Sequence, residues 1–313
     1  MPNNILITSY VEPDLDGTAC AVAYAEFLQA GGQKAEAALI GAPHEEVEFV
    51  FKYFGFAKPP QIKNAFGWDK IILVDASDTT GLEGKVPLDK VIEIIDHRQV
   101  NELDKFPNAA AQIELVGAAA TLVAEKFIFG RVEISKQAAP LLACAIISNT
   151  LNFNSPNTTK RDHQAFDWLN KLAKLPDNFA RTMFLAKSNL SGSRLATRLE
   201  KDLAHFEFGG HKIGITQIEM IGAEAIVANR SDEITATLAE IKQKFGLEYI
   251  FLNLVELEGK FNIFITDEPN SQRLIETVFK IKFSDNRARL PRLIMRKQIW
   301  PLVKAELEKV ASA

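Results

Sequence analysis

The residues of this chain that are best suited to chemistry begin with two aspartates, Asp14 and Asp16, which follow an apolar, β-branched stretch at residues 4–8. That stretch is typical of a short buried strand, and the apolar spacing from about Thr18 predicts a helix directly after the acids. Two carboxylates this close repel each other, so a divalent cation or solvent must compensate their charge. The alternative is that both aspartates only shape a turn and cap the helix.

Other polar residues follow predicted elements in the same way. Asp75 directly follows one strand-like apolar run, and Asp96 and His97 directly follow another. Ser148 and Asn149 close an apolar helical stretch. Because parallel strands bring their carboxyl ends to one edge of a sheet, these side chains are expected to converge. Carboxylates with an imidazole form a ligand set suited to Mn²⁺, Mg²⁺, Co²⁺ or Zn²⁺, and a bridging carboxylate can help two ions activate water against phosphorus.

The first half of the chain alternates apolar runs with helical patterns, which predicts an α/β fold with a doubly wound parallel sheet. The polar, glycine-containing stretch at 189–193 is the most linker-like segment. We therefore expect a first domain at 1–188, a linker at 189–193 and a smaller α+β domain at 194–313. The strands of the first domain are expected at 4–8, 35–41, 70–74, 90–95 and 112–115.

The second half changes its pattern. Alternating segments joined by glycines at 206–219 and 249–266 predict two hairpins. Helical spacing predicts helices at 194–204, 223–245, 272–279 and 297–310.

Composition narrows the class of protein. The chain has 313 residues, of which 47% are hydrophobic and 24% charged, which fits two globular domains. A net charge of −4 gives no support for general binding to nucleic acid or to anionic membranes. Cys20 and Cys144 stand in apolar helical contexts and are expected to be buried thiols. No signal peptide and no apolar run of ~20 residues is visible, so a cytoplasmic protein is expected.

Several ordered motifs resemble those of a known group of proteins. They are Pro13–Gly17 (PDLDG), Val74–Asp78 (VDASD), Asp96–Arg98 (DHR), Gly117–Leu122 (GAAATL), Ala145–Thr159 with Asp162, and Met295–Pro301 (MRKQIWP). Their order and spacing resemble the DHH phosphoesterase superfamily, and most closely its branch with a DHHA2-type second domain. That branch contains the family II, manganese-dependent inorganic pyrophosphatases and the exopolyphosphatases.

The resemblance implies a site in a cleft between the two domains. It places Asp14, Asp16, Asp75 and His97 on metal-ligand positions, with Asp75 as the bridging carboxylate. Asn149 would complete the ligand shell weakly, because an amide oxygen brings no charge. The implied cofactor is a divalent metal, with Mn²⁺ favoured and Co²⁺ or Mg²⁺ as alternatives, bound as one or two ions.

The resemblance also implies cationic residues that contact phosphate. Arg296 and Lys297 fall on or beside the positions that hold phosphate from the second domain. Together with Arg98 they are expected to neutralise charge that develops on phosphoryl oxygens. Arg296 and Lys297 belong to a basic run that also contains Arg287, Arg289 and Arg292. The alternative is that this run forms only a solvated helix start.

Four residues depart from the pyrophosphatase pattern. Tyr10 stands where these enzymes have a histidine, and Asn149 where they have an aspartate. Arg98 replaces the second histidine of the DHH motif, and a guanidinium does not release its proton near neutral pH. Ala204 stands where a lysine is expected.

These observations predict a metal-dependent hydrolase that acts on a phosphate anhydride or phosphoester, with pyrophosphate or short polyphosphate as substrate. The alternative is a catalytically impaired relative that binds a phosphorylated ligand or a partner protein, since the departures remove ligands and add a fixed charge. Processing of nucleic acid is the least favoured reading, and no membrane partner is expected. The resemblance further implies a possible homodimer through an edge strand of the first domain.

Overall fold

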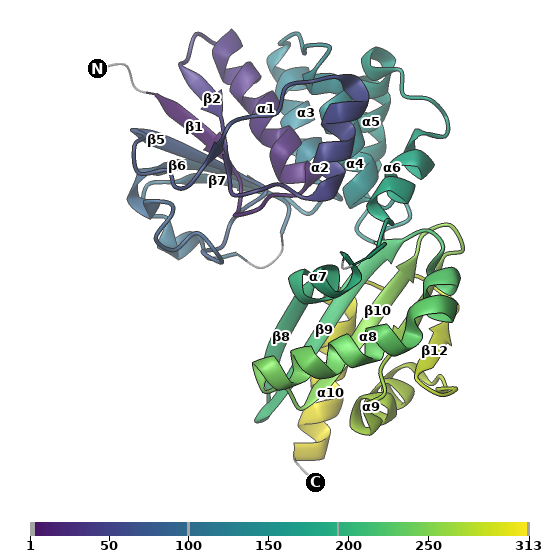
Figure 1. The fold of residues 1–313 in the computed structure, drawn as a ribbon. Coiled ribbons are helices and arrows are strands. Elements are labelled where there is room, and N and C mark those ends of the chain that lie inside the picture. Colours follow the sequence, from purple (N-terminus) through teal and green to yellow (C-terminus); the bar gives the residue numbers. More distant parts are fainter. Residues whose placement is uncertain (1–3, 99–100, 193, 312–313) are drawn as a thin grey trace. The chain divides into compact units, whose positions relative to one another are not determined.

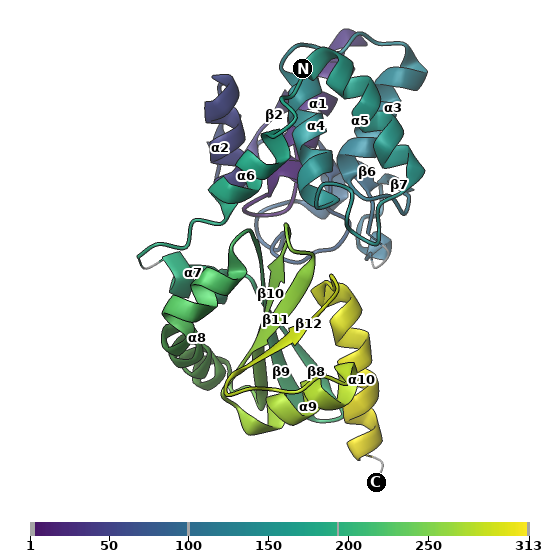
Figure 2. The same cartoon turned by 90° about the vertical axis from the view of Figure 1, so that its right-hand side faces the viewer.

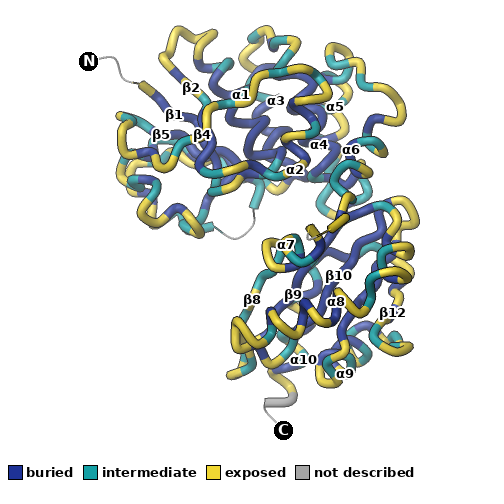
Figure 3. Tube along the Cα trace, viewed as in Figure 1, coloured by how far each residue is buried: buried dark blue, intermediate teal, exposed yellow. Residues whose placement is uncertain are grey.

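The computed structural model describes residues 4–98, 101–192 and 194–311. The chain divides into two compact units, Met1–Met183 and Phe184–Ala313, each built around its own sheet (Figure 1). Figure 3 shows that the strands of both sheets are largely buried, whereas the outer faces of many helices are exposed. The α/β class expected from the sequence is confirmed. Ser193, the last residue of the expected linker, lies outside the described residues.

The sheet of the first unit has five parallel strands in the order β2–β1–β5–β6–β7. The strand order reverses between β1 and β5, as it does in doubly wound sheets. Ligands of such sheets bind beyond the carboxyl ends of the strands at this switch point. The strands are β1 (Ile5–Thr8), β2 (Ala35–Ala37), β5 (Lys70–Val74), β6 (Val91–Asp96) and β7 (Ala110–Ile113).

Helices cover one face of this sheet, where α1 contacts β1 and β2 and also packs against α3 and α4 (Figure 1). The other face packs on loop residues, among them Ala65, Leu82 and Phe106. Helix α6 crosses the boundary between the units. The helices are α1 (Leu15–Ala30), α2 (Glu45–Phe54), α3 (Ala119–Gly130), α4 (Ala138–Asn149), α5 (Lys160–Ala173) and α6 (Phe179–Lys187).

Two elements differ locally from the expectation. Helix α1 begins at Leu15 rather than near Thr18, because the Asp14 side chain accepts a hydrogen bond from the amide of Gly17 (3.1 Å) and caps the helix. The stretch expected as one strand at 35–41 is divided between β2 and the short β3 (Leu39–Ile40), since β3 leaves the main sheet to pair with β4 (Gln61–Ile62).

The second unit is a mixed sheet in the order β12–β11–β10–β9–β8, in which β9 and β10 run parallel and the other neighbours antiparallel (Figure 2). Both expected hairpins are present. Separate cores fill the two faces, one beneath α7 and α8 and the other beneath α9 and α10. The elements are α7 (Arg194–Lys201), β8 (Leu203–Phe208), β9 (His211–Met220), α8 (Ala223–Phe245), β10 (Tyr249–Glu256), β11 (Phe261–Ile265), α9 (Pro269–Phe279), β12 (Arg287–Leu290) and α10 (Arg296–Ala311).

Strand β12 is an element that the sequence did not predict. Its residues alternate between exposed arginines and the buried Ala288 and Leu290, which is the pattern of an edge strand with one face on a core. The helix expected at 194–204 ends earlier, at Lys201, because Leu203 begins β8. Among the described helices, none has the length and apolar character that crossing a membrane requires.

Candidate metal centre

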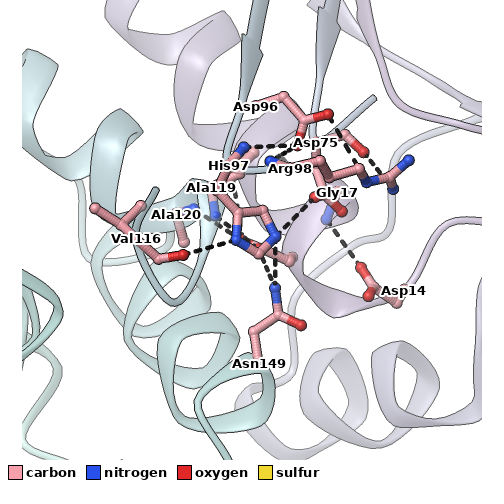
Figure 4. A network of polar contacts seen from close by, with 12 residues as sticks. Asp14, Gly17, Asp75, Asp96, His97, Arg98, Val116, Ala119, Ala120 and Asn149 are labelled. Carbon is pink, nitrogen blue, oxygen red and sulfur yellow. Dashed lines mark hydrogen bonds and ion pairs between the residues drawn. The ribbon is translucent and has the colours of Figure 1, made fainter. Parts of the chain in front are cut away.

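Three side chains of the first unit converge beyond the carboxyl ends of the central strands. Asp16 lies in the first turn of α1, Asp75 directly after β5, and His97 directly after β6. Each offers one ligand atom, and these atoms lie within 4.8 Å of one another. The two acids are almost fully buried, with 1% and 2% of their surfaces exposed. The structure therefore brings three of the five predicted metal ligands into one buried cluster. Figure 4 labels two of them, Asp75 and His97.

The backbone of Asp75 turns sharply to place its carboxylate there. Its φ of 54° lies in the left-handed region, which is uncommon for a residue other than glycine but is tolerated by aspartate better than by most. Its amide donates a hydrogen bond to the carbonyl of Ile95 (2.8 Å), so the turn is tied to the end of β6. The carboxylate Oδ1 lies 3.5 Å from Nε2 of His97. The turn after β5 thus positions the carboxylate beside the imidazole of His97.

The ring of His97 is oriented by a bond on its far side. Nδ1 lies 2.9 Å from the carbonyl oxygen of Val116, and because a carbonyl can only accept, the proton is on Nδ1. This leaves Nε2 directed at the carboxylates, which is the arrangement found for histidines that bind metals. Asp96, in contrast, accepts hydrogen bonds from Ser77 Oγ (2.5 Å) and from the amide of His97 (2.6 Å). Asp96 therefore shapes the loop and does not face the cluster.

Asp16 is held by the first turn of α3. Its two carboxylate oxygens accept hydrogen bonds from the amides of Ala119 and Ala120, each at 2.8 Å. Amides at a helix N-terminus favour a negative charge. Just before this turn, Gly117 packs closely on the region after α4, because a Cβ there would lie 2.6 Å from Thr150. The small-residue motif noted in the sequence therefore serves to hold Asp16.

Asn149, at the end of α4, lies against two members of the cluster. Its Nδ2 donates to Asp16 (2.5 Å) and is 3.4 Å from Nε2 of His97. Only the amide oxygen can act as a metal ligand, so binding would require the amide group to turn and present that oxygen. Figure 4 shows Asn149 pointing into the same polar network as His97.

Asp14 lies outside the cluster of three. Its carboxylate caps α1, and its backbone amide donates to the hydroxyl of Tyr10 (3.1 Å). The Arg98 guanidinium lies beside the ring of Tyr10, with 5.2 Å between the guanidinium carbon and the ring centroid. Arg98 also donates to the carbonyl oxygen of Asp75 (2.9 Å) and to the carboxylate of Asp78 (3.1 Å). The predicted residues Arg98 and Asp14 thus border the cluster.

The acids of the cluster resist ionisation when no cation is present. Burial raises the pKa of Asp75 to about 6, although its hydrogen bond with His97 acts in the opposite direction. Burial, with repulsion from Asp75, also raises the pKa of Asp16 well above its usual value. Burial opposes the charged form of His97, but the hydrogen bond and charge of Asp75 outweigh it and raise the pKa of this imidazole to about 9. Two buried carboxylates with an oriented imidazole nitrogen fit a divalent cation.

Sequence reasoning missed two residues that support the cluster. Glu46 of α2 is buried and accepts hydrogen bonds from the amide of Leu15 (3.2 Å) and from Ser148 Oγ (2.6 Å). Cys20 Sγ lies 3.6 Å from a carboxylate oxygen of Asp16. Glu46 stands among other glutamates in the first turn of α2, a pattern that is typical of a solvent-exposed helix start. The sequence therefore gave no indication that Glu46 is buried.

The cations predicted in the second unit have different surroundings. The Arg296 guanidinium donates to the carbonyl oxygens of Asp202 and of Ile215 (the latter at 3.2 Å), and its side chain is half-buried. Lys297 is exposed at the start of α10. Arg289 is exposed, stacks on Phe261 and pairs with a glutamate. Ala204, at the position where a lysine was expected, lies in β8.

Comparison with known proteins agrees with this arrangement. Two family models match the chain: "DHH family, N-terminal domain" over residues 4–146 and "DHHA2 domain" over residues 181–305. The manganese-dependent inorganic pyrophosphatase of Methanothrix thermoacetophila is 28% identical over 313 residues, which is 99% of this chain and 100% of that protein. A Clostridium acetobutylicum protein that bears the same name provisionally is 28% identical over 310 residues, covering 98% of this chain and 99% of its own.

A solved structure shows the same fold. The crystal structure of a Methanococcus jannaschii protein, described as a candidate family II inorganic pyrophosphatase, matches with a TM-score of 0.75 and 28% identity. The match covers 96% of this chain and 98% of that protein. The two family models also match in the order expected for such proteins, one on each side of the boundary region between the units. The chain therefore belongs to the DHH family, in the group that carries a DHHA2 domain.

Proposed function

We propose that this protein is a metal-dependent phosphohydrolase that cleaves a phosphate anhydride, with inorganic pyrophosphate as its substrate. The observation that carries the proposal is the buried cluster of Asp16, Asp75 and His97 at the switch point of a DHH-type sheet. Relatives matched over nearly the full chain are named manganese-dependent inorganic pyrophosphatases, which supports both the reaction and Mn²⁺ as the cofactor.

Asp16, Asp75 and His97 would hold the metal, with Asn149 contributing its amide oxygen. Asp14 remains a predicted ligand. Because its carboxylate caps α1, it would have to bind the metal while it keeps that hydrogen bond. A bound divalent ion polarises phosphoryl oxygens and lowers the pKa of bound water. The amides of Ala119 and Ala120 would keep the Asp16 carboxylate ionised and oriented toward the metal.

The cations would act on the substrate rather than on the metal. Arg98 carries a charge that does not titrate near neutral pH, so it would stabilise phosphoryl oxygens without supplying a proton. Arg296 and Lys297 are proposed as phosphate contacts of the second unit. A guanidinium has five N–H donors, so Arg296 retains donors for phosphate beyond those that it gives to the carbonyls of Asp202 and Ile215.

A second function has specific support and belongs to a different class. The chain could bind a phosphorylated ligand or partner without hydrolysing it, because Arg98 places a fixed charge beside Asp75 and the Asn149 nitrogen already bridges Asp16 and His97. In that case ligand binding would survive a chelator and would depend on Arg98. An enzyme would instead lose its activity in chelator.

The experiment is an assay of phosphate release from pyrophosphate and from tripolyphosphate with Mn²⁺, Co²⁺ and Mg²⁺ separately. Asp75→Asn removes the charge of the central carboxylate with little change of shape, and Asp69→Asn makes the same change at an exposed residue. Turnover of about 1 s⁻¹ or more is within the ordinary range of enzymes. Such turnover, lost in Asp75→Asn and kept in Asp69→Asn, would support the hydrolase. No turnover above Asp75→Asn with any metal would reject it in favour of the binding protein.

We also propose a cytoplasmic homodimer that does not bind nucleic acid. The two cysteines are free and buried, as is common in a reducing compartment. Strand β7 lies at an edge of the first sheet with Ala110 and Ala111 exposed, and the nearby Leu115 is 64% exposed. A mass measured by light scattering tests the dimer, and Leu115→Glu should reduce the mass to that of one chain.

A further inference from the structure

We propose that the centre holds a single divalent ion per chain and that the Arg98 guanidinium, seated on Tyr10, supplies a second, permanent positive charge. The inference rests on the proposed metal centre and deepens it. The resemblance to pyrophosphatases left the number of ions open as one or two, and the surroundings of Arg98 decide between them.

Arg98 is fixed among the acids that border the cluster. It donates to the Asp75 carbonyl (2.9 Å) and to Asp78 (3.1 Å), and its Nε lies 3.7 Å from the carboxylate of Asp96. Asp96 in turn accepts from the backbone amide of Arg98 (3.3 Å). A side chain held by acids on several sides does not swing away easily. Its charge is therefore a lasting part of the site.

Tyr10 supports this cation from its other face. The ring of Tyr10 lies 5.2 Å from the guanidinium carbon, within the range of a cation–π contact. The Tyr10 hydroxyl is engaged by the backbone amide of Asp14 (3.1 Å). A neutral phenol that accepts this bond is a poor ligand for a hard cation. Tyr10 thus contacts the Arg98 guanidinium. A histidine at the same position would instead offer a nitrogen ligand for a metal.

The three carboxylates have different roles: two face the expected metal position, and one caps a helix. Asp16 and Asp75 face His97 and form the cluster that fits an ion. Asp14, the remaining acid of the first motif, caps α1 next to Tyr10. A second dication shared between Asp14 and Asp75 would lie close to the guanidinium, and like charges at short range in a poorly solvated site repel strongly. The geometry therefore favours one ion together with one guanidinium.

The test is the metal content of the full chain. Purified protein would be equilibrated with Mn²⁺ and desalted, and its manganese counted by mass spectrometry and examined by electron paramagnetic resonance. We expect one ion per chain and the six-line signal of an isolated Mn²⁺. The variant Tyr10→His/Arg98→His replaces the phenol and the fixed charge by imidazoles, and should bind two ions with a broadened, exchange-coupled signal. The matched control Tyr10→Phe/Arg98→Lys keeps a ring and a charge and should bind one.

The outcomes are distinguishable. Two ions in the unaltered protein would overturn this inference and leave the proposed phosphohydrolase intact. No bound ion would overturn both, because the metal centre itself would be absent. A Tyr10→His/Arg98→His variant that folds, as judged by circular dichroism, and still binds one ion would contradict the claim that the Tyr10–Arg98 pair excludes the second.

Discussion

The two units of this protein use polar residues in different ways. In the first unit Asp16 and Asp75, the acids of the cluster, are buried, and Asp16 is held by the amides of α3. In the second unit the two cations predicted to contact phosphate differ: Lys297 is exposed, and Arg296 is bound to carbonyl oxygens of its own unit. The acids of the first unit are therefore held in place by the fold itself, whereas the cations of the second unit would gain their role, under the proposed function, only when substrate binds.

The largest expected effect comes from removing a charge of the buried cluster. Asp16→Asn leaves the amides of Ala119 and Ala120 without an anionic acceptor and removes a metal ligand. We expect phosphate release to fall by about 1000-fold, with most of the loss in kcat rather than in KM. Isothermal titration with Mn²⁺ should show a matching loss of affinity. Unchanged activity would mean that the buried acids of the first unit are structural.

The dependence of metal binding on pH is the next effect. The pKa of His97 is raised to about 9, so its proton stabilises the metal-free protein below pH 6.5 and this contribution is lost as the pH rises through 9. Manganese must displace that proton, so its affinity should rise about tenfold per pH unit between pH 7 and 8.5 and level off near 9. Titration calorimetry in several buffers measures both affinity and proton release. A flat profile would show that His97 is not a ligand.

Gly117→Ala tests how the centre is built. A Cβ at this position would lie 2.6 Å from Thr150 and 3.0 Å from Asp162, so the start of α3 must shift. We expect a loss of about 2 kcal/mol in the free energy of unfolding and of about tenfold or more in Mn²⁺ affinity. Gly67→Ala is the matched control, since nothing lies within 4 Å of the added Cβ there. Equal behaviour of the two variants would argue against the close packing of Gly117 on Thr150 and Asp162.

Asn149→Asp should change the Mn²⁺ affinity in the opposite direction. A carboxylate here adds a charged ligand beside Asp16 and His97, so Mn²⁺ affinity should rise by about tenfold. In the absence of metal the same change places another acid next to a buried one, so the chelated protein should unfold at a lower temperature. Thermal unfolding with and without Mn²⁺ measures both effects, and an unchanged affinity would place Asn149 outside the ligand shell.

The smallest effects separate the two cations of the second unit. Arg296→Ala leaves the carbonyls of Asp202 and Ile215 without their donor and should cost about 1–2 kcal/mol of unfolding free energy. Lys297→Ala changes an exposed residue and should alter stability by less than about 0.5 kcal/mol. Both should raise KM for pyrophosphate if they contact phosphate. A variant Lys297→Ala with unaltered KM would remove this lysine from the substrate site.

The sequence predicted the parts of the site that depend on local pattern. Asp75 and His97 follow β5 and β6 directly, and apolar runs that end in polar residues are easily recognised. The sequence could not show that Asp14 and Asp16 have different roles. Their positions differ only in the direction that each side chain takes at the start of α1, and tertiary packing decides that direction. The structure uses Asp14 as the cap of α1 and buries Asp16 against α3.

The remaining features depend on tertiary contacts. The burial of Glu46 arises because α2 meets the start of α1 and the end of α4, which no local pattern records. The edge strand β12 forms on a basic segment because β11 offers it a partner. The contact between the Arg98 guanidinium and the ring of Tyr10 likewise joins residues that are distant in the sequence.

The most direct test of the metal centre is anomalous diffraction at the manganese edge from crystals grown with Mn²⁺. We expect one anomalous peak in the first unit, coordinated by Asp16, Asp75 and Nε2 of His97, with the Arg98 guanidinium still in contact with the ring of Tyr10. A peak elsewhere, or none in crystals whose protein hydrolyses pyrophosphate in the same buffer, would contradict this expectation.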